Sequence, residues 1–381
     1  MPLFTIKNAV KLLVAAPLFM LTLEICARID DMVRYNAPLI GEYNWDKMLS
    51  TVDEYGRTGK PNGRFQNIRL NTYGFRGEMI EPIKGKDVCR VACIGASETF
   101  GYMEQPGYEW PAQLSMVLNA KGTKHYEVIN AAFPGRGLHS SIFHLEKRVM
   151  KFHPDIVILY SALYSYMNPR LQENREKSEQ AEQSKPDNSE EKGLDISLRP
   201  RILSKIKQLI KGLLPKPLLW KYQEYVGLSM LRDARAERTY DYFVDDASPI
   251  NLQIMKEDLN GFQSLCEKNN AQLIIATHAS YMTRRNLIGA WRFMPYFTEE
   301  GFRKADMRLN EKLVEFAKEN NILYVDIADL VPKDEAHMAD FTHFTDAGSE
   351  IVAKAFAQAI FSLDAEKSGD IEPLHLASVS D

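Results

Sequence analysis

The sequence predicts a doubly wound α/β domain around a parallel sheet of about five strands, and two patterns indicate this fold class. From about residue 87 onward, apolar segments of strand length alternate with amphipathic segments of helix length. The strand segments are apolar at nearly every position, which is typical of strands covered by helices on both faces. The chain has 381 residues, 45% of them hydrophobic, and a formal net charge of -4. This is a globular composition without the basic surplus expected of a protein that binds nucleic acid.

The expected elements alternate strictly through residues 87–363. Strands are expected at residues 89–96, 126–133, 154–162, 271–279 and 322–328. Helices are expected at residues 109–120, 138–152, 251–269, 299–320 and 346–363. Sheets of this kind place their functional sites beyond the carboxyl ends of the strands. Ser97 directly follows the first expected strand and is therefore a candidate site residue.

The first thirty residues differ from the rest of the chain. Lys7 and Lys11 precede an apolar stretch at residues 12–26, in which Glu24 is the only charge. The stretch is shorter than the ~20 residues that a full span prefers, and it lacks a good cleavage site. We expect an uncleaved membrane anchor at residues 1–30, with a cleaved signal or a buried helix as alternatives. The lysines before the stretch place the amino end in the cytoplasm and the body of the chain outside the membrane.

Residues 31–86 are expected to form a lead-in segment, and residues 170–250 an insert within the α/β domain. In the insert, residues 172–193 are almost wholly polar, as in flexible segments. Residues 201–214 have the pattern of an amphipathic helix with a lysine-rich face. Its apolar face comprises Ile202, Ile206, Leu209, Ile210, Leu213 and Leu214. Such a helix either packs on the α/β core or lies on an anionic lipid surface. Residues 364–381 are expected to be a loose tail.

Two segments carry residues suited to nucleophilic catalysis. "CIGASETFGYME", residues 93–104, places Ser97 between two glycines at the end of the first expected strand. Asp340 and His343 lie three residues apart, just before the last expected helix. A carboxylate so placed can accept the Nδ1–H of the imidazole, which leaves Nε2 free to take a proton from a serine hydroxyl. Taken alone, each segment also fits an ordinary turn, with a serine in one and a capping aspartate in the other.

Together the two segments resemble the SGNH, or GDSL-like, hydrolase family. The first motif of that family is similar to G-D-S-x-T-x-G, which residues 95–101 match except at Ala96. Its last motif is similar to D-x-x-H, which Asp340 and His343 match. The aspartate replaced by Ala96 gives structural support in the family more than chemistry. The resemblance therefore implies a catalytic triad of Ser97, His343 and Asp340.

Further motifs of the resemblance concern the oxyanion hole. "NAAFPGRG" is similar to the second motif and places Gly135 at the family's oxyanion glycine. In "PDIVILYSALYSYMN", where the third motif would end in G-x-N-D, Tyr164 stands in place of the asparagine, and Asn168 follows four residues later. The implied donors are the backbone N–H groups of Ser97 and Gly135, with Tyr164 or Asn168 as the third. "NTYGFRG" also looks like the lead-in of membrane-anchored bacterial members, and the resemblance covers residues 68–363 without the insert.

The resemblance implies a serine esterase that needs no metal or organic cofactor. Ser97 would attack an ester carbonyl while His343, oriented by Asp340, takes its proton. With the expected anchor, it implies a single-pass protein of the bacterial inner membrane with its α/β domain in the periplasm. The expected substrates there are acylated glycans, and acetyl esters are the first choice. Two alternatives are an O-acyltransferase of polysaccharide biosynthesis and a non-catalytic binding or assembly component with a degraded oxyanion hole.

Overall fold

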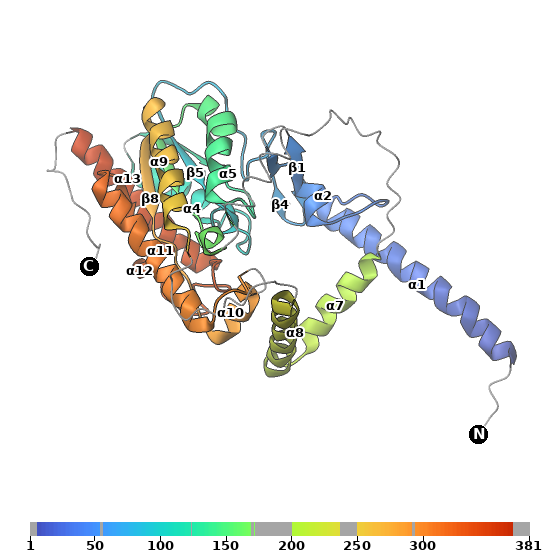
Figure 1. Cartoon of the computed structure of the whole chain (residues 1–381). Coiled ribbons are helices and arrows are strands. Elements are labelled where there is room, and N and C mark those ends of the chain that lie inside the picture. Colours follow the sequence, from blue (N-terminus) through green and yellow to red (C-terminus); the bar gives the residue numbers. More distant parts are fainter. Residues whose placement is uncertain are drawn as a thin grey trace, which may run out of the picture.

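The computed structural model describes residues 6–53, 56–122, 124–168, 171, 200–236, 250–291 and 294–368. The polar stretch at residues 172–193 and the tail beyond residue 368 lie outside the described residues, so the expectations for them stay predictions. Within the described part, an α/β body is joined to helices from the amino end and from the insert (Figure 1).

The centre of the body is a parallel sheet of five strands, which confirms the predicted fold class. The strands are β5 (Val88–Ile94), β6 (His125–Asn130), β7 (Ile156–Leu159), β8 (Gln272–Ala276) and β9 (Leu323–Val325). They lie side by side in the order β6-β5-β7-β8-β9. Each strand lies within the range expected from its apolar run, except that β5 and β6 begin one residue earlier.

Helices cover both faces of this sheet in two hydrophobic layers (Figure 1). One layer contains α5 (Leu138–His144), α9 (Leu252–Lys268) and α11 (Glu299–Glu319), and the other contains α4 (Trp110–Lys121) and α13 (Asp346–Ser368). Within β5, Ala92 and Ile94 belong to the first layer, whereas Val91 and Cys93 belong to the second. Because neighbouring residues of a strand point to opposite faces, covering both faces requires an apolar residue at every position.

The carboxyl ends of neighbouring strands carry the segments that the motifs indicated. β5 and β7 pair in parallel, and each is followed by a short helical turn, α3 (Ser97–Phe100) and η3 (Tyr164–Met167). The loop at residues 340–343 directly precedes α13 and lies beside the end of β8, where the backbone N–H of Tyr281 donates to the carbonyl of Phe341 at 3.0 Å. The other short helices of the body are η1 (Leu145–Val149), η2 (Met150–Phe152), α10 (Arg284–Trp291) and α12 (Ile327–Leu330).

The lead-in segment contains secondary structure that the sequence did not predict. It forms α2 (Trp45–Leu49) and two antiparallel hairpins, β1 (Ser50–Asp53) with β2 (Gly56–Gly59) and β3 (Arg64–Phe65) with β4 (Ile68–Arg69). Leu49 and Leu70 of this segment form a buried cluster with Phe100 and Phe133. The lead-in therefore packs directly on the first and second motifs.

The amino-terminal helix α1 (Ile6–Tyr35) extends away from the body (Figure 1). Helix α7 (Arg201–Leu213) packs against the second half of α1, where Lys205 lies 2.7 Å from both Asp30 and Asp31. Helix α8 (Lys216–Ala236) follows α7 and lies against α10. On the apolar face of α7, Leu209 and Leu213 are 63% and 75% exposed. This face is therefore not packed on the α/β core, which was one of the two alternatives.

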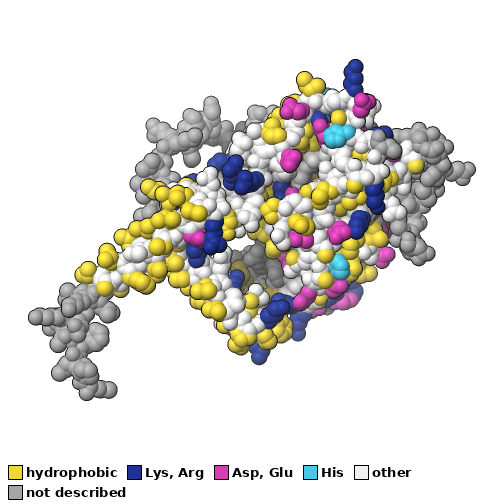
Figure 2. Space-filling model, turned by 180° about the vertical axis from the view of Figure 1, so that it is seen from behind, with side chains coloured by type: hydrophobic (Ala, Val, Ile, Leu, Met, Phe, Trp, Pro, Cys, Tyr) yellow, Lys and Arg dark blue, Asp and Glu magenta, His cyan; other side chains and the backbone are white. Residues whose placement is uncertain are grey.

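Hydrophobic side chains also cover the projecting part of α1, as Figure 2 shows. Leu18 and Phe19, for example, are 64% and 63% exposed. Even so, no helix in the described ranges is both long enough and apolar enough to span a bilayer. The transmembrane anchor predicted at residues 1–30 has no support from the structure and stays an expectation.

Candidate active site

The first motif turns sharply from β5 into α3 and brings Ser97 to the rim of the sheet. A Cβ atom on Gly95 would lie 2.0 Å from the carbonyl oxygen of Tyr160 and 2.3 Å from Thr99 Oγ1, so only glycine fits this turn. The hydroxyl of Thr99 donates to the same Tyr160 carbonyl at 2.6 Å. These contacts fix Ser97, the first residue of α3, against the end of β7.

Ser97, His343 and Asp340 form a continuous hydrogen-bonded chain. The distance from His343 Nε2 to Ser97 Oγ is 2.8 Å, and the distance from His343 Nδ1 to Asp340 Oδ2 is also 2.8 Å. The other carboxylate oxygen of Asp340 accepts the backbone N–H groups of Thr342 and His343, both at 2.9 Å. The loop therefore orients its own carboxylate, and the carboxylate orients the imidazole toward the serine.

The surroundings of His343 favour its protonated form. Burial alone lowers the pKa of His343, but the hydrogen bond and charge of Asp340 outweigh this effect, and the carboxylates of Glu98 and Glu104 add to it. The net pKa of His343 lies above its ordinary value. Burial raises the pKa of Asp340, but its contacts with His343 and with backbone N–H groups outweigh burial and lower it. An ionised aspartate beside a histidine that readily gains a proton is suited to general base catalysis.

Two backbone N–H groups are available for an oxyanion hole. Within the described part of the chain, neither the N–H of Ser97 nor that of Gly135 donates to another residue. Gly135 has φ +80°, a conformation that other residues rarely adopt, in a turn where the N–H of Arg136 donates to the carbonyl of Phe133. The N–H of Phe133 in turn donates to the carbonyl of Gly95 at 3.3 Å. The second motif is thereby held against the first.

The Tyr164 side chain lies in surroundings other than those expected of a third oxyanion donor, and Asn168 contacts the start of α9 through its backbone. The ring of Tyr164 packs among aromatic side chains, and its hydroxyl lies 3.4 Å from His278 Nδ1. The carbonyl of Asn168 accepts a hydrogen bond of 2.9 Å from the side chain of Asn251, at the start of α9. The expectation for Tyr164 came from its position in the third motif. In the structure Tyr164 is the first residue of η3, and this helical turn sets the direction of its side chain.

Two buried charged residues that support Ser97 were missed by the sequence prediction. Glu98 is 1% exposed, and its carboxylate accepts the backbone N–H of Ala162 at 2.8 Å. Arg76 of the lead-in is also buried, and its guanidinium donates to the carbonyl of Phe100, at the end of α3, at 3.1 Å. Both residues lie inside quoted motifs, but a charged residue in a loop is usually solvated, so burial could not be expected from sequence.

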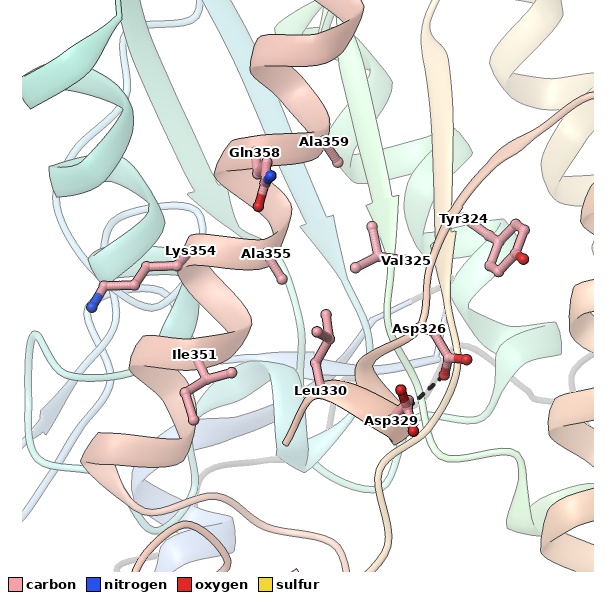
Figure 3. A pocket seen from close by; sticks show the side chains of 10 residues that line it. All are labelled: Tyr324, Val325, Asp326, Asp329, Leu330, Ile351, Lys354, Ala355, Gln358 and Ala359. Carbon is pink, nitrogen blue, oxygen red and sulfur yellow. Dashed lines mark hydrogen bonds between the residues drawn. The ribbon is translucent and has the colours of Figure 1, made fainter. Parts of the chain in front are cut away.

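A separate cavity of about 220 Å³ lies between β9, α12 and α13 (Figure 3). Its lining is mostly apolar, and within it the backbone N–H of Asp329 donates to the Asp326 carboxylate. None of the candidate site residues lines this cavity. Among the described residues, no group of His, Cys, Asp and Glu side chains is arranged to hold a metal ion.

The sequence matches no protein-family model, and no curated protein matches it either. Several solved structures are similar. A member of the lipolytic G-D-S-L family from Veillonella parvula is 12% identical, covering 72% of this chain and 98% of its own, with a TM-score of 0.38. The lipase/acylhydrolase from Enterococcus faecalis is 16% identical, covering 75% and 99%, with a TM-score of 0.40. An acetylxylan esterase from Geobacillus stearothermophilus is 14% identical, covering 74% and 96%, also with a TM-score of 0.40.

The descriptions of these structures agree with the resemblance to the SGNH, or GDSL-like, family seen in the motifs. Because the identities and TM-scores are low, these likenesses carry no weight for the activity of this chain.

Proposed function

We propose that this chain is a serine ester hydrolase of the SGNH type, which removes acyl groups, acetyl above all, from glycans. The observation that carries the proposal is the hydrogen-bonded chain Asp340–His343–Ser97, with 2.8 Å at each contact between side chains. A serine hydroxyl is a weak nucleophile unless a base takes its proton in this manner. The unused N–H groups of Ser97 and Gly135 supply donors for the negative charge that develops on the ester oxygen.

In the proposed reaction, His343 Nε2 takes the proton of Ser97 Oγ as this oxygen bonds to the ester carbonyl carbon. The carbonyl oxygen becomes negatively charged and accepts hydrogen bonds from the two N–H groups. Its electrons then re-form the carbonyl, and the sugar oxygen leaves with the proton from His343. Water, losing a proton to His343, attacks the acyl-serine in the same way. The acid is released, and the proton returns to Ser97.

A glycan substrate is supported by an exposed aromatic side chain at the site. Tyr102 is 41% exposed, and its ring centroid lies 5.6 Å from that of His343. Aromatic faces present apolar area at little conformational cost, and the C–H faces of sugar rings pack against them. This arrangement would place an acylated sugar beside the imidazole.

Release of acetate from a panel of O-acetylated oligosaccharides tests the proposal. The wild-type protein is expected to release acetate from at least one of them, and Ser97→Ala is expected to release none above the rate without protein. Equal release by the two proteins would contradict the proposal. Adding an unacetylated acceptor sugar distinguishes hydrolysis from transfer, because a transferase moves the acetyl group to the acceptor instead of to water.

One observation favours a second candidate, a non-catalytic glycan-binding component. The hydroxyl of Tyr164, one of the two expected third donors, faces His278. An oxyanion hole that lacks one donor loses about 10²–10³ in rate. Glycan binding without release of acetate from any substrate would favour this candidate.

We also propose that α1 and α7 hold the protein on a membrane surface, with the α/β domain outside the cytoplasm. The support is the exposed apolar face of α7, with Leu209 and Leu213, together with the exposed side chains of α1. Lys207 and Lys211 of α7 suit a negatively charged lipid surface.

A further inference from the structure

The lead-in segment carries an excess of positive charge next to the second motif. Residues 57–77 contain five basic residues and no acidic residue, namely Arg57, Lys60, Arg64, Arg69 and Arg76. All except Arg76 are exposed. Figure 1 shows the strands β1 and β4 of this segment beside the α/β body.

Arg57 faces Gly135, the glycine with one of the two unused N–H groups. A Cβ atom built on Gly135 would lie 3.9 Å from Arg57 Nη1. The rest of the guanidinium is held in place: Nε donates to Ser50 Oγ at 2.8 Å, and Nη2 pairs with the carboxylate of Asp46. Its carbon also lies 5.6 Å from the centroid of the Phe133 ring. The Nη1 group is thus oriented toward Gly135 before any ligand binds.

A second guanidinium lies behind Arg57 and increases the positive potential. Arg136 is 7% exposed, and its Nη2 donates to the backbone carbonyl of Arg57 at 3.1 Å. Its buried Nε has no partner in the described part of the chain, and no described carboxylate forms an ion pair with it. Burial lowers the pKa of Arg136, the charge of Arg148 lowers it further, and the charge of Asp53 raises it in part. A buried charge without an ion-pair partner is costly, so an anion bound nearby would stabilise it.

Tyr102 lies next to the catalytic residues as well. Its exposed ring is near His343, and its centroid lies 5.0 Å from that of Trp45 in α2. The residue after Trp45 is Asp46, which pairs with Arg57. Two neighbouring residues of α2 therefore contact both proposed binding residues, Trp45 the ring of Tyr102 and Asp46 the guanidinium of Arg57.

We propose that Arg57 is a specificity-determining residue that binds the anionic group of an acylated acidic glycan, while Tyr102 contacts a sugar ring and the ester reaches Ser97. The proposal rests on the proposed function and adds the charge of the substrate to it. The anion is a carboxylate of a uronic acid or a phosphate on a sugar, because both accept charge-assisted hydrogen bonds of the kind that the Nη1 group of Arg57 can donate.

The test measures equilibrium binding to the Ser97→Ala protein by calorimetry, so that hydrolysis does not remove the ligand. The probes are an O-acetylated oligouronate, its uncharged methyl ester, and an O-acetylated sugar phosphate. The oligouronate or the phosphate is expected to bind about tenfold more tightly than the methyl ester. Tighter binding of one acidic probe assigns the anion as carboxylate or phosphate. Equal binding of all three would overturn the proposal.

Variants locate the effect. Adding Arg57→Gln is expected to remove the preference for the acidic probe and to leave the affinity for the methyl ester unchanged. Arg57→Lys, which keeps the charge, is expected to retain part of the preference. Arg64→Gln removes another exposed charge from the same segment and serves as the matched control. If it lowers the affinity for the acidic probe as much as Arg57→Gln does, the charge acts non-specifically and the proposal fails.

Failure of the proposed esterase activity and failure of the anion site give different experimental results. If the wild-type protein hydrolyses no ester while the acidic probe still binds through Arg57, the proposed function is wrong and the anion site stands. If esters are hydrolysed but neutral and acidic substrates are used equally, with or without Arg57→Gln, the anion site is wrong and the esterase stands.

Discussion

Ser97, His343 and Asp340 show what residue spacing in a sequence can predict. The spacing of Asp340 and His343 predicted that the carboxylate could reach Nδ1 of the imidazole, and the structure has this contact at 2.8 Å. Their proximity to Ser97 followed from the resemblance, because no local pattern connects residues so far apart in the chain. Glu98, Arg76 and the surroundings of Tyr164 could not be predicted, since each depends on packing between distant segments.

The pH dependence of ester hydrolysis tests the role of His343. His343 has to be neutral to accept the serine proton, and its contacts with Asp340 raise its pKa above 6.5. The kcat/KM of ester hydrolysis should therefore rise with pH to a plateau, with a midpoint above that value. In Asp340→Asn the midpoint should move down, and the plateau should fall by about 10³–10⁴-fold. A wild-type midpoint at or below the ordinary histidine value would contradict the role of this pair.

The substitution Tyr164→Phe tests whether the Tyr164 hydroxyl takes part in catalysis. The Tyr164 hydroxyl faces His278 and is not expected to contact the ester oxygen, so its loss should lower kcat/KM by less than about tenfold. The hydroxyl also contacts the loop before α13 through Thr342, and a small loss of stability is expected. Steady-state kinetics on an activated acetyl ester, with thermal unfolding beside it, provides the measurement. A loss of about 10²–10³ at unchanged stability would restore Tyr164 as the third donor.

Among the elements, the five strands were predictable because each is a continuous apolar run covered on both faces. The lead-in was not, since β1 to β4 have two to four residues each and contain glycine and charged side chains. Such strands have no periodicity of their own, and the lead-in is also held by contact with the body. The Leu49 and Leu70 cluster provides this contact at α3.

A buried carboxylate, Glu104, connects α13 to the turn after α3 and is expected to make the stability of the protein depend on pH. Glu104 is 7% exposed and accepts hydrogen bonds from Ser349 Oγ at 2.6 Å and from the N–H of Met103. Burial raises the pKa of Glu104 from 4.5 to about 7. Between these two pH values the folded state keeps a proton that the unfolded chain has lost, so stability falls as pH rises through this window and levels off above it.

Glu104→Gln should remove this part of the pH dependence. Relative to wild type, the variant should gain about 3 kcal/mol in free energy of unfolding between about pH 4 and about pH 8. Urea unfolding at several pH values measures the difference. Glu350→Gln, an exposed position on the same helix, should follow the wild type. If the free energies of unfolding of Glu104→Gln and wild type differ by the same amount at all pH values, the Glu104 carboxylate does not titrate in this window.

The exposed apolar side chains of α1 and α7 form a surface away from the candidate active site. We predict that the protein binds vesicles containing anionic lipid and that binding weakens as salt rises, because the lysines contribute electrostatically. The double variant Leu209→Gln/Leu213→Gln should bind much less, whereas Met116→Gln/Met307→Gln, at exposed apolar positions of the body, should bind as wild type does. Equal sedimentation of both variants with vesicles would show that the apolar face of α7 is not the contact.

The central claim is that the fold brings together two segments far apart in the sequence, around Ser97 and around His343, to form an activated serine. The most direct test is covalent labelling by a fluorophosphonate, followed by mass spectrometry of the labelled peptide, because the reagent reacts only with an activated nucleophile. We expect a single label on Ser97, which should be absent in Ser97→Ala and form much more slowly in Asp340→Asn. A folded wild-type protein that takes no label, or takes it at another residue, would contradict the claim.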